Sequence, residues 1–384
     1  MASLEQYFPF GIAKMPAFIG REQDESWLEK NMRAGVHTLL LAPRRYGKSS
    51  LVLHTLAKGK FPFSELDLQL CRTGKSIEKK IRHGIEQVIF SAVTEKEKIL
   101  HAAKLFFKKN NKQWKIGLKG FVEVTIEPDR YEDIAENILT SLQFLESVLS
   151  QENKKVVIFM DEIQEIINVE SSLEIQGAIR HFAQKSSHAV FVFSGSNRRM
   201  LRHMFHDNSM PLYQLCDVIT LDKIEAKYYQ EYLRKISKLT WGFVIADDLI
   251  DAIMRLSERH PRRIYNLCLY VWRLIDIQKE KPTIEHIQQA WKKLITADLK
   301  GVRYLLSQRN TSQLKVLSYL ALKNTRELTS KDAQRITNLS ATAIINALQK
   351  LEEDDLVERM TSGEYRFIDP VIKAVLTTYE QELI

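Results

Sequence analysis

The sequence contains little cysteine, with three in 384 residues. Cys71, Cys216 and Cys268 lie far apart, and none has the spacing of a metal ligand. This pattern argues against a cysteine-based metal site and suits the reducing cytoplasm. We expect the three thiols to be buried as small apolar side chains.

Long apolar runs are also missing. No stretch reaches the roughly 18 consecutive apolar residues of a membrane span. The N-terminus lacks the basic segment and apolar run of a signal peptide. Internal repeats and low-complexity segments are absent as well. We therefore expect a cytoplasmic protein of two or three domains, at roughly 100–200 residues for each.

The charge balance is basic, with a net charge of +8 and a pI near 9.1. Such a balance favours an anionic partner, which can be a nucleotide, a nucleic acid or an acidic membrane surface. Residues 71–120 hold 13 basic and 4 acidic residues, a net charge of +9. This basic insert has two interpretations: a solvated helical face, or a surface for an anionic partner.

Short apolar runs alternate with helical patterns over the first 220 residues. This alternation predicts a parallel sheet with helices on both faces. Residues 114–126 alternate in polarity around Gly117 and Gly120 and predict a hairpin. Residues 1–16 are expected to be an extended lead-in. The predicted strands are 37–41, 63–68, 156–160 and 189–193, and the predicted helices are 20–31, one from Lys48, 76–92, 95–109 and 131–149.

After Ile219 the pattern becomes helical, with a predicted break at 296–304. Three further helices and two short strands follow the break, which is the order of a winged helix. The predicted helices are 223–235, 247–257, 261–278, 283–294, 311–322, 330–336 and 340–354, and the predicted strands are 356–358 and 365–368.

Residues 42–50, APRRYGKSS, match the phosphate-loop pattern G-x-x-x-x-G-K-[ST] at every position except the first. Gly47 keeps the loop open, Lys48 supplies a charge for the β- and γ-phosphates, and Ser49 offers a hydroxyl to magnesium. Ala42 replaces the first glycine, which matters if that position needs a positive φ. The predicted phosphate-binding residues are Ala42, Pro43, Arg44, Arg45, Tyr46, Gly47, Lys48, Ser49 and Ser50.

Two later strands end in polar residues that suit the same site. Asp161 and Glu162 follow an apolar strand, and we expect Asp161 to bind Mg²⁺ with Ser49, and Glu162 to polarise the attacking water. Ser196 and Asn197 follow the next strand and are candidates for sensing the γ-phosphate. The alternatives are a solvated acidic turn and a plain Ser-Gly turn.

Together these segments resemble the AAA+-like P-loop ATPases of the STAND and archaeal-ATPase type, which are relatives of the origin-recognition ATPases. The resemblance implies a three-layer α/β P-loop NTPase core at 1–220, with the basic insert at about 71–126. It further implies a helical lid at 221–300 and a winged helix at 301–384. It is carried by FIGRE at 18–22, PRRYGK at 43–48, MDEIQEI at 160–166, SGS at 194–196 and HPRR at 260–263.

The resemblance also implies roles for individual residues. Ile19 and Gly20 would lie against adenine, and Pro261 resembles the lid proline that contacts the base. Arg262 or Arg263 resembles the second sensor, which reaches a phosphate from the lid. Arg198 and Arg199 are weaker candidates for an arginine finger.

We therefore expect an ATP- and Mg²⁺-binding ATPase that turns over slowly and acts as a nucleotide-dependent regulatory switch. The alternative is an ATP-regulated, initiator-like DNA-binding protein that uses the winged helix or the basic insert. A scaffold that holds nucleotide without hydrolysis is a third possibility. The predicted recognition helix offers Asn346, Gln349 and Lys350, but four acids at 352–355 end it, which would suit a protein partner better than DNA.

Overall fold

The computed structural model describes residues 3–93, 95, 99, 101–102, 105–106, 114–119, 123–128, 133–323, 326–360 and 362–383. The chain forms two compact units. The sheet unit comprises Glu22–Ala42 and Lys48–Leu221, and the helical unit comprises Met1–Arg21, Pro43–Gly47 and Asp222–Ile384.

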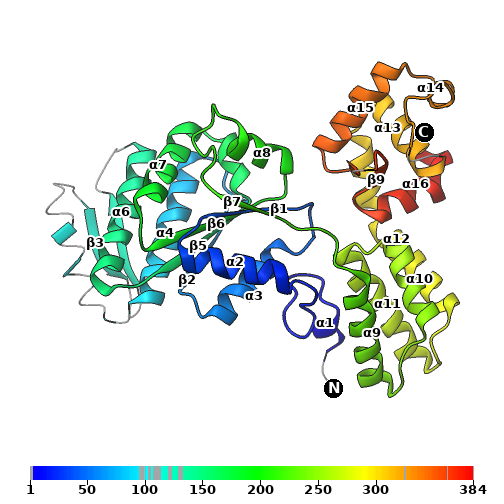
Figure 1. Ribbon diagram of the computed structural model, residues 1–384, viewed down its shortest axis with the longest axis horizontal. Coiled ribbons are helices and arrows are strands. Elements are labelled where there is room, and N and C mark those ends of the chain that lie inside the picture. Colours follow the sequence, from blue (N-terminus) through cyan, green and yellow to red (C-terminus); the bar gives the residue numbers. More distant parts are fainter. Residues whose placement is uncertain are drawn as a thin grey trace. The chain divides into compact units, whose positions relative to one another are not determined.

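A five-stranded parallel sheet forms the centre of the sheet unit (Figure 1). Its order is β2-β5-β6-β1-β7, so β6 lies between β1 and β5. Leu40 pairs with Ser194, and Met160 pairs with Phe193, which places the carboxyl ends of β1, β6 and β5 along one edge. The strands are β1 (Thr38–Leu41), β2 (Phe63–Asp67), β5 (Val156–Asp161), β6 (Ala189–Ser194) and β7 (Asp217–Thr220).

Helices cover both faces of this sheet, as Figure 1 shows. Because successive strand residues point to opposite faces, Leu39 and Leu41 join the core under α4, α6 and α7, whereas Leu40 does not. The arrangement confirms the predicted three-layer α/β fold. The helices are α2 (Glu22–Ala34) and α3 (Lys48–Gly59) on one face, and α4 (Gly74–Ala92), α6 (Ile134–Glu152) and α7 (Ser172–Lys185) on the other.

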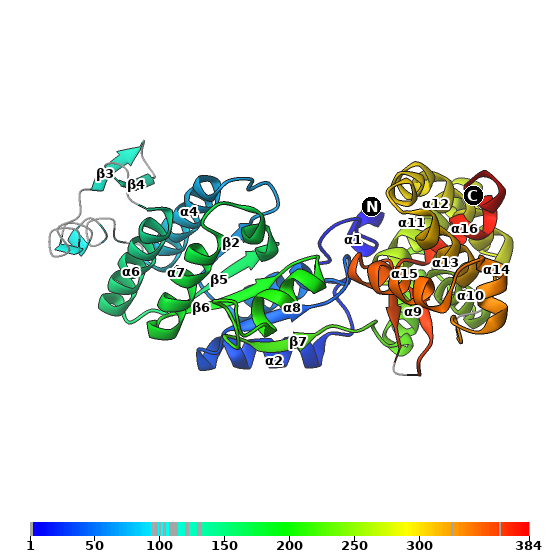
Figure 2. The same cartoon turned by 90° about the horizontal axis from the view of Figure 1, so that it is seen from above.

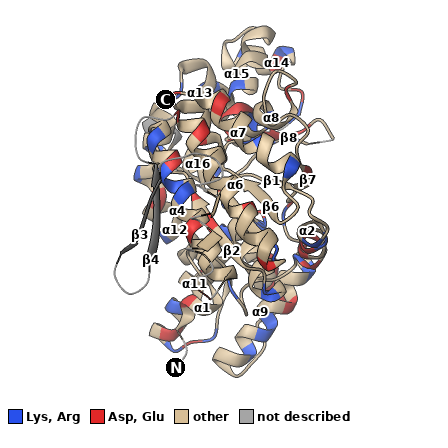
Figure 3. Cartoon of the chain, turned by 90° about the vertical axis from the view of Figure 1, so that its left-hand side faces the viewer, with Lys and Arg blue, Asp and Glu red and all other residues tan. Residues whose placement is uncertain are grey.

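The basic insert is described only in part. Its predicted hairpin is confirmed as β3 (Trp114–Lys119) paired antiparallel with β4 (Glu123–Pro128), a sheet separate from the main one (Figure 2). Lys and Arg residues of α4 are blue in Figure 3, and Lys75 and Lys79 are exposed there. Most of the helix predicted at 95–109 lies outside the described residues, as do Lys96, Lys98, Lys104, Lys108, Lys109 and Lys112.

The helical unit begins with an N-terminal segment that is anchored by one buried ring. The extended lead-in expected at 1–16 is partly wrong, because a short helix forms and Phe8 is fully buried. The Phe8 ring lies 4.8 Å from that of Trp272, which stacks on Trp241 at 4.0 Å. The helices of this part are α1 (Leu4–Tyr7), α9 (Ala226–Trp241), α10 (Asp247–Ser257), α11 (Pro261–Gln278) and α12 (Ile284–Ser307).

One long helix, α12, replaces the break expected at 296–304. The helix is continuous from Ile284 to Ser307 and passes through Gly301. Val302 and Leu306 are buried, so they continue the apolar face begun by Leu294. Tertiary packing of this face outweighs the cost of about 1 kcal/mol that glycine brings to a helix interior.

The C-terminal elements follow the predicted order of three helices and a hairpin. Side chains of Asn310, Ser330 and Ser340 cap the three helices. A last helix, which the sequence did not predict, packs against α12 and the first of the three (Figure 2). No described helix is long and apolar enough to cross a membrane. The elements are α13 (Thr311–Leu322), α14 (Lys331–Thr337), α15 (Ala341–Glu353), β8 (Val357–Arg359), β9 (Tyr365–Phe367) and α16 (Pro370–Leu383).

Candidate nucleotide site

The carboxylate of Asp161 joins the ends of three elements at the edge of the sheet. Its Oδ2 accepts a hydrogen bond from Ser49 Oγ at 2.7 Å. Its Oδ1 accepts from Ser194 Oγ and from the amide of Glu162, the latter at 3.0 Å. The two residues predicted to bind the metal, Ser49 and Asp161, are therefore in direct contact.

Lys48, at the start of α3, is nearly buried, with 7% of its surface exposed. Its Nζ donates to the carbonyl oxygen of Ala42 at 3.0 Å. A phosphate would offer this nearly buried ammonium a charged acceptor.

The backbone of the phosphate loop resolves the question raised by Ala42. Only Arg45 and Gly47 within residues 42–50 have positive φ, at 66° and 93°. Ala42 is fully buried and needs no left-handed conformation, so alanine fits where the motif has glycine. A Cβ at Gly47 would meet no atom within 4 Å, so space does not demand glycine there. The positive φ does, because glycine adopts it without a steric penalty.

Glu162 is held by three hydrogen bonds to a single carboxylate oxygen. Oε2 accepts from Ser196 N at 3.0 Å, Ser196 Oγ at 2.7 Å and Gln164 Nε2 at 2.5 Å. The glutamate has a left-handed backbone, with φ of 54°. Gly195 has no room for a side chain, because a Cβ would lie 1.9 Å from Gln164 Oε1.

Two opposing effects set the pKa of Glu162. Burial raises the pKa, but hydrogen bonds from Ser196 and Gln164, together with the charge of Lys48, lower it by more. The net result is a pKa below the ordinary value for glutamate. Glu162 is therefore an ionised carboxylate at neutral pH, and a hydrogen-bonded one.

The two predicted sensor residues have different surroundings. Ser196 contacts Glu162, whereas Asn197 Oδ1 accepts from Met200 N at 3.0 Å and caps α8 (Arg198–His206). Sequence reasoning did not single out Ser194 or Gln164. Ser194 could have been found as the last residue of the strand next to Asp161, but Gln164 has no sequence signal. Arg198 and Arg199 form the first turn of α8, and Arg199 is exposed.

Residues Pro43–Gly47 of the loop belong to the helical unit. The Tyr46 ring lies edge-on to His260, with centroids 5.3 Å apart. Arg21 Nη2 donates to the carbonyl oxygens of Tyr46 at 3.1 Å and Asp222 at 2.8 Å. Arg21 thus fastens the loop to the segment before α9, a role that sequence reasoning missed.

The residues predicted to contact adenine lie beside the first turn of α9. Gly20 has a φ of 64°, and a Cβ there would be 2.5 Å from Ile224 and 2.9 Å from the ring of Tyr228. Ile19 packs, half-buried, against the core of the helical unit. Gly20 therefore borders the ring of Tyr228, and Ile19 borders the apolar core of the same unit.

Arg262 and Arg263 differ sharply in their partners. Arg263, 3% exposed, donates to Asp369 at 2.8 and 2.5 Å and to Asp298 at 2.5 Å, so two carboxylates occupy its guanidinium. Burial lowers the pKa of Arg262, and the nearby Arg45 guanidinium lowers it further. An anion at Arg45 would relieve this repulsion, so Arg262 is the remaining candidate.

Pro261 and His260 form the start of α11. Pro261 takes the first helical position, where its missing N–H costs nothing. His260 is 1% exposed, and burial lowers its pKa to about 4. The histidine is therefore neutral and serves as a packing partner of Tyr46.

The donor set at Asp161 fits a magnesium ion. A hydroxyl and a carboxylate are hard oxygen ligands, and Mg²⁺ typically takes few protein ligands and completes its shell with phosphates and water. Among the described residues there is no group of three or more His, Cys, Asp or Glu that could hold a metal ion. Ser49 and Asp161 therefore fit a metal bound together with a nucleotide.

No protein-family model and no curated protein matches the chain. Several solved structures match it. A Walker-type ATPase of Pyrococcus abyssi matches with a TM-score of 0.69 and 17% identity, over 96% of this chain and 99% of that one. The ORC2 protein of Aeropyrum pernix, in ADPNP–ADP complexes, matches with a TM-score of 0.52 and 13% identity, over 94% and 95%. The chain has the fold of the AAA+-like P-loop ATPases.

Proposed function

We propose that the protein binds ATP with Mg²⁺ and hydrolyses it slowly. The observation that carries the proposal is the contact between Ser49 and Asp161, which brings the phosphate-loop helix and the acidic strand end together. Glu162 follows Asp161 directly, and its carboxylate accepts hydrogen bonds from Ser196 and Gln164. Phosphate-binding, metal-binding and basic groups thus occupy one sheet edge.

Each residue of this edge has a distinct role in the proposal. Lys48 exchanges its bond to the Ala42 carbonyl for the β- and γ-phosphates, and the N-terminus of α3 points its positive end at them. Ser49 and Asp161 would hold the magnesium, which when bound offsets the negative charge of the phosphates. Glu162 accepts a proton from, or orients, the attacking water.

The restraint on Glu162 supports slow turnover. A general base works best with a pKa near the working pH, and the pKa of Glu162 is lower than that of an ordinary glutamate. Its Oε2 is also occupied by three donors. Water must therefore use Oε1, or displace a donor from Oε2.

A regulatory role rests on the pair Arg262–Arg263. We propose that Arg262 senses the nucleotide, and its neighbour Arg263 joins α11 to Asp298 of α12 and to Asp369 ahead of α16. A shift at Arg262 is thereby passed to the lid at 221–300 and the winged helix at 301–384. Such a switch requires contacts that differ between the ATP and ADP states.

The test uses the full chain with ATP, GTP and ADP. We expect ATP to bind with a Kd of roughly 1–10 μM, and turnover far below the typical enzyme value of about 10 s⁻¹. Chelation of Mg²⁺ should stop phosphate release. Absence of ATP binding at about 1 mM, the upper end of ordinary substrate affinities, would refute the proposal. Equal competition by GTP would refute its preference for adenine.

A second candidate, DNA binding through α15, is favoured by one observation. The acids at the end of this helix are engaged within the protein. Glu353 lies 3.3 Å from Lys350, Glu352 accepts from the Arg359 amide at 3.0 Å, and Asp354 pairs with Arg309. Their repulsion of phosphates is thereby reduced, while Asn346 and Gln349 remain exposed.

Duplex DNA binding at several salt concentrations tests this candidate. If α15 reads DNA, affinity should fall steeply with salt, and replacing Asn346 and Gln349 with alanine should cost about 1–3 kcal/mol for each base that is no longer read. Unchanged affinity in this double variant would exclude α15 as the reading helix. No binding at about 50 mM salt would exclude the function.

A further inference from the structure

A basic cavity lies within the helical unit, and none of the residues that line it has been assigned a role above. Its volume is about 370 Å³, which falls at the small end of the range for ligand sites. Four cations and one carboxylate line it, for a net charge of +3. The cations are Lys223, Arg255, Arg259 and Arg366, and the carboxylate is Glu258.

The backbone at the end of α10 positions this lining. Glu258 and Arg259 are consecutive left-handed residues, with φ of 46° and 55°. Left-handed backbone costs roughly 1–2 kcal/mol for each residue other than glycine. Lys223 Nζ donates to the Glu258 carbonyl at 2.9 Å and braces this turn from the segment before α9.

Acids near the cavity do not balance its charge. Glu358 pairs with Arg366 at 2.5 Å and offsets that one cation, whereas Glu258 is shared with Lys373, which lies 3.6 Å away and is not part of the lining. Within the described part of the chain, the side chains of Arg255 and Arg259 form no hydrogen bond or ion pair, and only their backbone groups are bonded.

The pKa of Lys223 is lowered by burial and by the same excess of positive charge. Burial, followed by the charge of Arg366, lowers its pKa to about 8. The other charges that act on it are Glu258 and Glu358, which raise the pKa, and Arg259, which lowers it. Lys223 and Arg259 are only partly exposed, so a bound anion that offsets their charge would stabilise this region.

We propose that this cavity binds a small phosphorylated ligand with at least two negative charges. Arginine forks bind phosphate oxygens in pairs, and Arg255, Arg259 and Arg366 come from different parts of the lining. Ala226 and Met254 add only a small apolar surface. Because the cations converge on a cavity instead of following a helix face, a small ligand fits better than a duplex.

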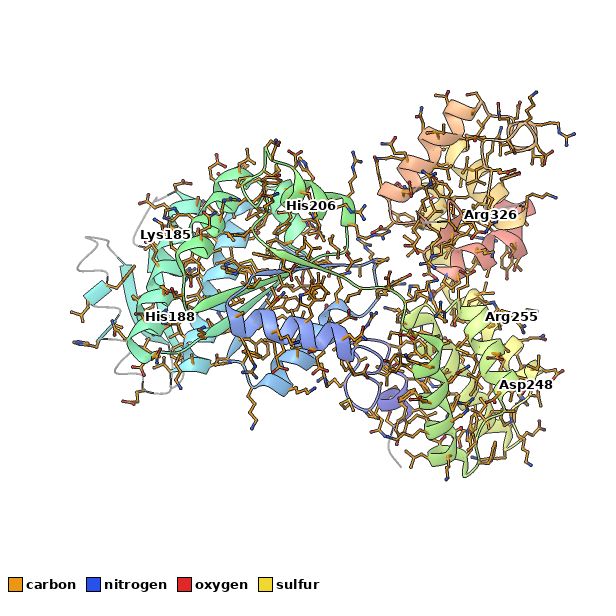
Figure 4. The ribbon with its side chains drawn as sticks, in the orientation of Figure 1. Lys185, His188, His206, Asp248, Arg255 and Arg326 are labelled. Atoms are coloured by element: carbon orange, nitrogen blue, oxygen red, sulfur yellow. The ribbon has the colours of Figure 1, made fainter. Side chains whose placement is uncertain are left out.

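The origin of the lining residues gives the ligand a structural effect. Arg255 lies on α10, where Figure 4 labels it, and Arg259 lies just after that helix. Arg366 lies on β9, about a hundred residues further along the chain. One anion that contacts all three holds the β8–β9 hairpin against the end of α10. The ligand therefore stabilises one arrangement of the C-terminal hairpin.

Calorimetric titration with pyrophosphate tests the proposal. All proteins carry Lys48→Ala, so the phosphate loop does not contribute and the test does not depend on the ATPase assignment. The test variant adds Arg255→Gln and Arg259→Gln. The control adds Lys235→Gln and Lys238→Gln, which remove two exposed charges from α9 of the same unit.

We expect the test variant to bind pyrophosphate at least tenfold more weakly, and the control to stay within twofold. Melting temperatures without ligand verify that both variants fold. Phosphate and ADP titrations identify the source: tighter binding of ADP than of pyrophosphate points to a nucleotide, and the reverse to a free diphosphate. Equal pyrophosphate affinity in the test variant overturns the proposal. So does the lack of binding by all three anions at 1 mM, or arginine-dependent binding of duplex DNA alone.

Discussion

Replacing Lys48 with alanine is expected to weaken ATP binding by at least 100-fold. The ammonium is 7% exposed and donates to the Ala42 carbonyl, a neutral acceptor that phosphate oxygens can replace. Hydrogen bonds to charged groups are worth about 1.5–3 kcal/mol each, and the variant would lack more than one of them. Titration with a fluorescent ATP analogue and calorimetry with ATP measure the change.

The matched control for this variant is Lys155→Ala. Lys155 is exposed and lies just before β5, at the amino end of that strand. Its replacement removes the same charge from the same unit, at the sheet edge opposite to the candidate site. Its ATP affinity should stay within twofold. Loss of the Lys48–Ala42 bond should lower stability by about 1 kcal/mol, which a melting curve without nucleotide detects. If Lys48→Ala binds ATP within threefold of the natural protein, the phosphate-loop assignment is wrong.

Replacing Glu162 with glutamine is expected to preserve ATP binding and lower turnover by at least 100-fold. General acid–base catalysis contributes typically 10²–10⁴-fold, and an amide cannot accept the proton. Glutamine has nearly the same shape, and its amide oxygen can accept from Ser196 N and Oγ as the carboxylate does. The variant should therefore fold normally and accumulate the ATP-bound form. Single-turnover phosphate release measures the loss.

Glu165→Gln is the control for charge. Glu165 lies three residues further along, and its carboxylate pairs with Arg72 at 3.0 Å, an exposed pair worth about 1 kcal/mol or less. This variant removes the same charge from the same segment and should keep turnover within twofold. Unchanged turnover in Glu162→Gln would show that another group acts on the water. An equal fall in both variants would trace the effect to charge alone.

The sequence predicted the fold well where apolar periodicity is strong. The strands at β1, β2, β5 and β6, and the helices α10, α11 and α13, lie where expected. It missed β7, because Asp217–Thr220 is short and half polar. The break expected before the C-terminal helices is absent because buried Val302 and Leu306 hold α12 together around Gly301, a tertiary effect that local pattern does not show.

Site residues were predictable where a motif specifies them. Lys48, Ser49, Asp161 and Glu162 follow from spacing and strand order, and the structure places Ser49 against Asp161. The roles of Ser194, Gln164 and Arg21 depend on which strand lies beside which, and no local signal reports that. Likewise, the sequence does not distinguish Arg262 from Arg263, and only the ion pairs of Arg263 with Asp298 and Asp369 do so.

The continuity of α12 has a mechanical consequence. At about 1.5 Å per residue, its 24 residues form a rod of about 36 Å without a hinge. A rod cannot absorb rotation along its length, so turning its first end by roughly 10° carries its far end through about 6 Å. Arg263 forms an ion pair with Asp298, near the middle of α12, and another with Asp369, just before α16. A small tilt where α12 packs on α11 would therefore be magnified at the far end of α12, just before α13 begins.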